Sequence, residues 1–146
     1  MTARGLRNNN PGNIDYNSRN AWQGQLPPDP LIEKRFARFD TPENGIRALA
    51  KLLLAYRGKD GMPGVGAPGI DTIHETINRW APSVENNTSA YVKAVAKAAG
   101  VGPVQSIDIR EPRILTAVVT AIIAHENGSN PYASSVIAEG VRRALT

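Results

Sequence analysis

The sequence predicts a mainly α-helical protein of about five helices with a small β-hairpin. Three observations lead to this fold class. Apolar residues recur at helical spacing in several segments, and most of these segments begin at a capping residue or a proline. Glycine, proline or an Asn-Gly pair follows most of them, which is typical of helix ends. A strand-like alternation is confined to the short stretch 35–39, where aromatic and basic residues alternate.

The first 30 residues predict turns instead of regular structure. They are polar and rich in Asn, Gly and Pro, and these residue types favour tight turns. Residues 22–25 could pair with the strand 35–39, which would give the small hairpin.

The first long helix is expected at residues 42–56. Thr41 can cap it, Pro42 suits the first helical position, and Glu43 suits the positive end of the helix dipole. Residues 58–69 hold five glycines and two prolines and predict a mobile loop within a domain.

Four further helices are expected, at residues 71–80, 87–100, 112–125 and 134–145. Asp71 is the expected cap of the first of these, and Asn87 or Thr88 is the expected cap of the second. We expect one lysozyme-like catalytic domain, residues 1–146, for the reasons given below.

Length and composition exclude several classes of protein. The 146 residues suffice for one domain with a sizeable core, and 41% of them are hydrophobic. With no cysteine there is no disulfide framework, and the two histidines lack the spacing of a metal site. No apolar run of about eighteen residues predicts a membrane span, and no signal peptide is visible.

The charge balance is basic, with 17 Lys and Arg against 13 Asp and Glu. A basic protein suits an anionic polymer, such as peptidoglycan, teichoic acid, lipopolysaccharide or nucleic acid. The positive residues are scattered along the chain and form no stripe, which disfavours nucleic acid as the partner.

Glu126 is the candidate catalytic residue. It follows the most apolar stretch of the chain, 114–125, and precedes Asn127–Gly128, which predicts a helix end. The carboxyl is therefore expected on the last turn of a buried helix, where burial and the negative end of the dipole favour its protonated form. General acid catalysis near neutral pH needs a protonated group of this kind. A helix-end Glu that points into water is the alternative.

The candidate substrate-binding residues lie near the N-terminus. Residues 8–13 read Asn-Asn-Asn-Pro-Gly-Asn, and Trp22 follows them. Amide side chains both donate and accept hydrogen bonds, which suits sugar hydroxyl and N-acetyl groups, and an indole face suits a sugar ring. The residues expected to bind a glycan are Asn9, Asn10, Asn13 and Trp22. A loop held together by Asn turns, with Trp22 in the core, is the alternative.

Four segments follow one another along the chain: Asn9–Ile14, Trp22–Gly24, Phe36–Phe39 and Thr41–Gly45. In this order they resemble part of the lysozyme superfamily, in its glucosaminidase and transglycosylase branches. In that superfamily the helix ending in the catalytic Glu precedes such segments, whereas here Glu126 follows them. The resemblance therefore implies a circularly permuted lysozyme-like domain, a change that folds tolerate because termini lie on the surface.

Residues 9–13, the segment Arg79–Pro82 and the pattern Asn87-Thr88-x-x-Tyr91 carry a second resemblance. They are similar to segments of small phage and prophage muralytic proteins. This similarity implies phage origin, and it implies that Tyr91 lines a substrate groove.

A two-carboxylate glycosidase would need a second acid. Asp15, close to the Asn cluster, is the candidate second acid. Asp40, Glu43 and Glu85 are better explained as turn and helix-cap residues. Because no acid is paired with Glu126 by spacing, a single-Glu mechanism of the transglycosylase type is favoured over a retaining muramidase.

These observations predict a peptidoglycan-cleaving enzyme, either an endolysin or a virion-associated protein. Glu126 would protonate the leaving oxygen of the β-1,4 bond next to N-acetylmuramic acid and would then act as a base. We expect no metal or cofactor, peptidoglycan as the partner, and a monomer. The protein would act after release from the host cytoplasm to the cell wall, or from the virion. A non-catalytic wall-binding or structural virion module is the alternative.

Overall fold

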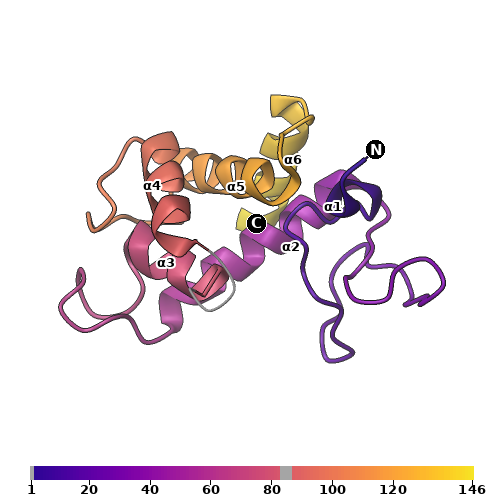
Figure 1. Cartoon of the computed structure of the whole chain (residues 1–146), viewed down its shortest axis with the longest axis horizontal. Helices are drawn as coiled ribbons and strands as arrows, with labels where there is room; N and C mark the ends of the chain where they lie inside the picture. Colours follow the sequence, from indigo (N-terminus) through magenta and orange to yellow (C-terminus); the bar gives the residue numbers. More distant parts are fainter. Residues whose placement is uncertain (1, 83–86) are drawn as a thin grey trace. The chain divides into compact units, whose positions relative to one another are not determined.

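The computed structural model describes residues 2–82 and 87–146, and this part of the chain is mainly helical (Figure 1). The helices in chain order are α1 (Arg4–Arg7), α2 (Pro42–Ala55), α3 (Ile73–Trp80), α4 (Thr88–Ala99), α5 (Pro112–Asn127) and α6 (Ser134–Leu145), and a 3₁₀ turn, η1 (Tyr56–Gly58), follows α2. The mainly α class is confirmed, whereas the lysozyme-like and permuted arrangement stays a prediction. Glu85 lies outside the described residues.

Side-chain caps explain where α2 and α4 begin. At α2, Thr41 Oγ1 accepts a hydrogen bond from the backbone N of Asn44 at 3.3 Å, as predicted. At α4, Asn87 is the cap, and its Oδ1 accepts from the backbone N of Ala90 at 3.3 Å. Gly100 ends α4 with a φ of 70°, a left-handed conformation that glycine adopts without strain.

At α3 the predicted cap, Asp71, is wrong by one residue. Thr72 Oγ1 accepts from the backbone N of Glu75 at 3.1 Å and donates to the Glu75 carboxylate at 2.9 Å. Glu75 is buried, and its other oxygen accepts from the backbone N of Met62 at 2.8 Å. The Glu75 carboxylate therefore orients the hydroxyl that caps α3 and holds the Gly- and Pro-rich loop that precedes the helix.

Helix α5 continues two residues beyond the predicted end at His125. It includes Glu126 and Asn127, and Gly128 follows with a φ of 77°. The predicted place of Glu126 on the last turn is confirmed.

The predicted pairing of residues 22–25 with 35–39 is present as one antiparallel bridge, Gln25 with Phe39, and a regular β-hairpin is not confirmed in the described residues. The segment 35–40 instead makes two isolated antiparallel bridges with different partners, Asp15 with Phe36 and Gln25 with Phe39. The backbone N of Ala37 donates to the carbonyl of Ile14 at 2.9 Å. The segment thus ties two N-terminal turns together without forming a regular sheet.

The chain divides into two compact units. Unit 1 comprises Met1–Lys51 and Ile122–Thr146, and unit 2 comprises Leu52–Ala121. Helices α2 and α5 each contribute residues to both units. The prediction of a single domain, residues 1–146, stays a prediction.

In unit 1, helix α6 packs closely on α2. A Cβ atom on Gly140 would lie 2.5 Å from Cγ2 of Ile46, so only glycine allows this approach. Arg143 Nη1 donates to Asn44 Oδ1 at 3.1 Å. The apolar core of unit 1 contains Ile14, Ala37, Phe39, Ile46, Leu49, Ile122, Ile123, Ile137 and Val141.

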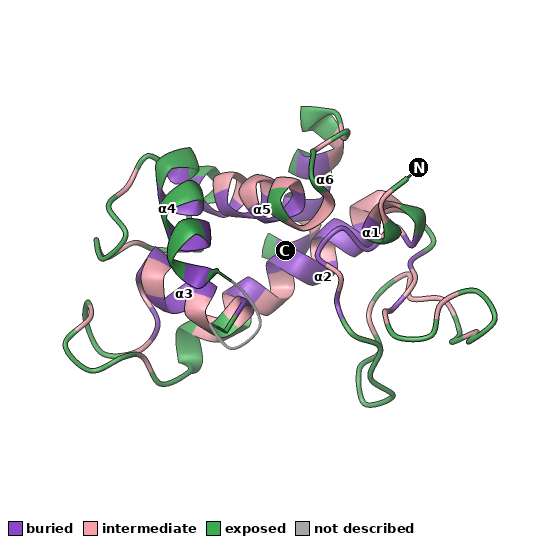
Figure 2. Cartoon of the chain, in the orientation of Figure 1, coloured by how far each residue is buried: buried purple, intermediate pink, exposed green. Residues whose placement is uncertain are grey.

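In unit 2, α3 and α4 pack on each other. Figure 2 shows α4 with one buried and one exposed face, as its spacing of apolar residues predicts. The core of unit 2 contains Leu53, Ile73, Ile77, Tyr91, Val92, Val95, Leu115, Val118 and Val119. Among the helices that the structure describes, none combines the length and apolar character that crossing a bilayer requires.

Candidate functional site

The N-terminal turn, residues 8–14, is called the Asn loop here, and its shape depends on its asparagines. Asn9 and Asn13 both have a φ of 51°, a left-handed conformation that Asn tolerates better than most residues. Asn10 is fully buried, and its Oδ1 accepts from the backbone N of Ile14 at 3.0 Å. Its Nδ2 donates to the carbonyls of Ile14 and Ala37, both at 2.9 Å. Asn10 therefore holds the loop together and has no exposed amide for a sugar, contrary to the prediction.

The loop lies directly on α2. A Cβ atom on Gly45 would lie 1.7 Å from the carbonyl oxygen of Asn9, so this contact requires glycine. The half-buried Asn9 donates from Nδ2 to the carbonyl of Phe39 at 3.1 Å. The position of Asn9 is thus fixed by α2 on one side and by the segment 35–40 on the other.

The Asn loop also contacts the last turn of α5. Asn127 Nδ2 donates to the carbonyl of Pro11 at 2.8 Å and to the carbonyl of Ile123, one turn earlier in α5, at 2.9 Å. A circularly permuted lysozyme-like domain requires the Asn cluster to lie beside the end of the helix carrying Glu126, and this contact brings the two segments together. Asn127 was interpreted in the sequence only as part of a stop signal, and it is the residue that joins the two segments.

Two amide oxygens are buried at this junction with no hydrogen-bond partner in the described structure, Asn13 Oδ1 and Asn127 Oδ1. Both lie against Gly5, where a Cβ atom would be 2.8 Å and 2.6 Å from them. A side chain on residue 5 would therefore force apart the Asn loop and the end of α5.

Glu126 itself is half-buried on the last turn of α5. Its neighbours in sequence differ in their surroundings, because His125 is exposed and Asn127 is held by the Asn loop. The carboxyl belongs to unit 1, together with the Asn loop. Glu126 therefore lies on the same turn of α5 as Asn127, the residue that contacts the Asn loop.

Trp22 and Asp15, the other predicted residues of this region, also belong to unit 1. Trp22 is half-buried, and its Nε1 is buried without a hydrogen-bond partner among residues 2–82 and 87–146. Asp15 is exposed and pairs with Arg35, whose Nε lies 2.7 Å from Asp15 Oδ1. Asp15 is therefore engaged in an exposed contact on the surface of unit 1.

Tyr91 does not line an accessible surface. It lies on α4 in unit 2, and none of its surface is exposed. Its ring contributes to the core of that unit, so the groove position implied by the resemblance is not available to it. The Asn87 and Tyr91 spacing thus reflects a helix cap and an inward-facing residue one turn later.

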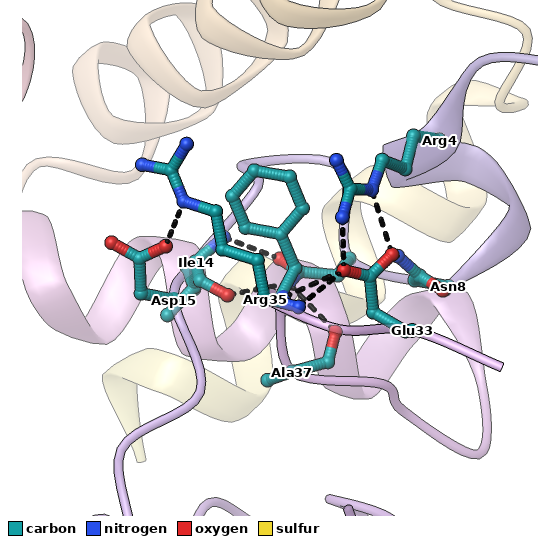
Figure 3. Close-up of polar contacts among 9 residues, drawn as sticks. Arg4, Asn8, Ile14, Asp15, Glu33, Arg35 and Ala37 are labelled. Atoms are coloured by element: carbon teal, nitrogen blue, oxygen red, sulfur yellow. Dashed lines mark hydrogen bonds and ion pairs between the residues drawn. The ribbon is translucent and has the colours of Figure 1, made fainter. Parts of the chain in front are cut away.

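Sequence reasoning missed a second polar cluster, centred on Glu33 (Figure 3). The Glu33 side chain is only 4% exposed, and its carboxylate accepts from Arg4 Nε at 2.7 Å and from Asn8 Nδ2 at 3.0 Å. The backbone N atoms of Arg35 and Phe36 donate to it as well, at 2.8 Å and 2.9 Å. The hydrogen bonds from Arg4 hold the pKa of Glu33 well below its usual range. This cluster fixes the start of the Asn loop through Asn8, whereas Asn127 holds the loop at Pro11.

Glu33→Gln is expected to destabilise the protein at neutral pH more than in acid. A lowered pKa in the folded state stabilises the fold above the unfolded-state pKa of about 4.3, and this contribution is lost as the pH falls further. The measurement is urea unfolding at pH 7 and at pH 3. The difference in the free energy of unfolding between the native protein and the variant should be smaller at pH 3. An equal difference at both pH values would show that the charge of Glu33 is not what stabilises the loop.

Asn127→Ala is expected to lower the free energy of unfolding by about 1–2 kcal/mol, because it leaves the Pro11 carbonyl without its donor. Backbone NMR shifts of the Asn loop should change in the same variant. Asn20→Ala, at an exposed turn residue, is the control and should leave both readouts unchanged. A variant with native stability and native loop shifts would mean that Asn127 does not hold the junction.

Within residues 2–82 and 87–146, no three His, Asp or Glu side chains gather closely enough to hold a metal ion.

Comparison with known proteins identifies the class of protein. No protein-family model matches the chain. The chain is 39% identical over 140 residues to Protein P5 of Pseudoalteromonas phage PM2, and the match covers 94% of this chain and 79% of that protein. The chain is therefore of phage origin, as the sequence predicted. It belongs to the family of Protein P5 of phage PM2.

Proposed function

We propose that the protein cleaves the glycan strands of peptidoglycan, with Glu126 as a single general acid and base. The observation that carries this proposal is the hydrogen bond from Asn127 to the Pro11 carbonyl. It joins the turn carrying Glu126 to a loop of amide side chains that are 116 residues away in sequence. A carboxylic acid beside hydrogen-bonding amides is the arrangement that protonates a glycosidic oxygen and holds an N-acetylated sugar.

In this mechanism the Glu126 proton moves to the bridging oxygen as the β-1,4 bond next to N-acetylmuramic acid breaks. The departing sugar leaves with that proton, and positive charge develops on the ring that remains. The ionised Glu126 then removes a proton from the incoming nucleophile. Attack by water gives a reducing end, and attack by the muramic acid C6 hydroxyl gives an anhydro end.

The site residues support one acid more than two. The carboxylate of Asp15, the candidate second acid, is engaged in an exposed ion pair with Arg35. Asn9, Asn13 and Trp22 are the sugar-binding candidates that remain after Asn10 and Tyr91 are assigned to the core. Asn13 and Trp22 are half-buried, and each also carries one buried polar atom without a partner in the described structure, Oδ1 and Nε1, which ordered water would satisfy.

The test is a turbidity assay on purified peptidoglycan, followed by mass spectrometry of the soluble products. Anhydro ends would indicate a lytic transglycosylase, and reducing ends a hydrolase. Walls that stay intact but carry the protein into the pellet would overturn the proposal in favour of a non-catalytic wall-binding module. Walls that stay intact and leave the protein in solution would favour a structural role in the virion.

A further inference from the structure

A groove of about 600 Å³ lies in unit 1, beside the Asn loop. Its floor includes Asn9 and the buried Phe39, and Leu26 and Ile32 form apolar walls. Arg7 and Arg38 also line it. A volume of this size is within the range of about 300–1,000 Å³ that is typical of ligand sites. Glu126 is not among the described residues that line this groove.

Ile32, in the apolar wall, is exposed, and its backbone is held in a turn. Ile32 is 63% exposed, and its backbone N donates to the carbonyl of Asp29 at 2.9 Å. The backbone N of Leu31 donates to Asp29 Oδ1 at 3.0 Å. Ile32 is followed by Glu33, whose carboxylate is fixed by Arg4 and Asn8 (Figure 3). The backbone on both sides of Ile32 is therefore fixed, and its exposed side chain offers an apolar contact at the groove.

The two arginines of the groove differ from most other arginines of unit 1. Arginines 4, 35, 142 and 143 each form an ion pair with a carboxylate. Neither Arg7 nor Arg38 has a carboxylate within 4.0 Å in the described part of the chain. Arg38 Nη2 donates to the carbonyl of Pro27 at 2.9 Å, which fixes the direction of its guanidinium. A guanidinium matches the two oxygens of a carboxylate, so the groove offers two cationic donors that could bind one.

The groove also contains two carboxylates, and both are engaged within the protein. Glu33 is neutralised by Arg4. Asp40 Oδ1 accepts from Asn44 Nδ2 at 2.9 Å, at the start of α2. The groove and its neighbour Arg4 therefore carry three positive charges (Arg4, Arg7 and Arg38) and two negative charges (Glu33 and Asp40). The net positive charge favours an anionic ligand.

We propose that this groove binds an acidic peptide with small aliphatic side chains, whose carboxylate is held by Arg7 and Arg38. The aliphatic side chains would cover Leu26 and Ile32, which a phosphodiester backbone would not do. If the protein acts on peptidoglycan, as proposed above, this ligand is the peptide stem of the wall. The groove then recognises the peptide while the region around Glu126 acts on the glycan.

The test is an NMR titration of the full-length protein with the peptide Ala-Glu-Ala-Ala and with the same peptide in fully amidated form. Saturable shifts of groove residues are expected with the acidic peptide, and amidation is expected to weaken binding about tenfold, the effect of losing charge-assisted hydrogen bonds. Arg38→Gln and Arg7→Gln should each weaken binding of the acidic peptide at least about fivefold. Asp40→Asn, which removes a negative charge from the groove, should strengthen it.

Arg19→Gln is the matched control, because Arg19 is exposed in a turn and does not line the groove. The proposal is overturned if Arg19→Gln weakens binding as much as Arg38→Gln does. It is also overturned if the amidated peptide binds as well as the acidic one, or if no shifts saturate. Displacement of the peptide by an equal concentration of inorganic phosphate would likewise overturn it, because the groove would then be a general anion site.

This test is independent of cleavage. Glu126→Gln protein should bind the acidic peptide as the native protein does. Peptide binding without any wall lysis would overturn the proposed glycosidase function and leave the peptide site standing. Wall lysis without peptide binding would overturn the peptide site and leave the proposed glycosidase function standing.

Discussion

Replacing Glu126 by Gln is expected to reduce the rate of wall lysis at least about a hundredfold. The amide keeps the shape of the side chain but cannot give up a proton to the glycosidic oxygen, and acid–base catalysis by one group contributes roughly a hundredfold or more. Because Glu126 is half-buried on the last turn of α5, the fold should be retained. The measurement is the initial rate of turbidity loss, with an unfolding curve of the same preparation.

Glu111→Gln is the matched control for this experiment. Glu111 is exposed and directly precedes α5, so the two variants change carboxyls near opposite ends of the same helix. We expect the control to lyse walls at the native rate. Native lysis by the Glu126 variant would show that Glu126 is not the acid.

The largest loss of stability is expected for Gly45→Ala. In the middle of a helix such a change ordinarily stabilises, by roughly 0.5–1 kcal/mol. Here the new Cβ atom would lie 1.7 Å from the carbonyl oxygen of Asn9 and 3.3 Å from Cδ of Pro11. The Asn loop would have to move away from α2, and the contact between Pro11 and Asn127 would be strained with it. The free energy of unfolding should fall by about 2–4 kcal/mol, at the upper end of overpacking effects.

Gly58→Ala provides the comparison, because a Cβ atom there meets nothing within 4 Å. That variant should stay within about 0.5 kcal/mol of the native protein, as for most surface changes. If Gly45→Ala is as stable as Gly58→Ala, the close approach of the Asn loop to α2 does not exist in solution. Wall lysis by Gly45→Ala, measured at a temperature where it is folded, should also be reduced.

The helix boundaries that depend on local chemistry were predictable from the sequence. Helix α4 runs between Asn87 and Gly100 because a side-chain cap and a left-handed glycine fix its two ends. The single turn of α1 was not predicted, because Arg4–Arg7 has no side-chain cap. Arg4 instead bonds to Glu33, a contact between residues 29 positions apart that no local pattern reveals. The predicted pairing of residues 22–25 with 35–39 occurs at one bridge, and a regular hairpin is not confirmed, because the segment 35–40 also pairs with Asp15.

The candidate site was predictable at the level of segments and less so for single side chains. The order of the motifs predicted that the Asn loop lies near the end of α5, and the bond from Asn127 to Pro11 bears this out. Residue type alone did not tell which amides face inward. Asn10 was therefore expected to bind sugars, although its amide forms hydrogen bonds with Ile14 and Ala37. Tyr91 was misplaced for the same reason.

Unit 1 has a consequence for the order of events during protein synthesis. Its first segment ends at Lys51 and its second begins at Ile122, so the ribosome must make residues 52–121 in between. At about 5–20 residues per second this interval lasts on the order of 4–14 s. Throughout that time the nascent Asn loop lacks the side chain of Asn127, and α2 lacks the partner that Gly140 brings. The Asn loop therefore cannot form its contact with Asn127 until residues 122–146 have been made. A chain released before that point would contain the Asn loop without the hydrogen bond from Asn127.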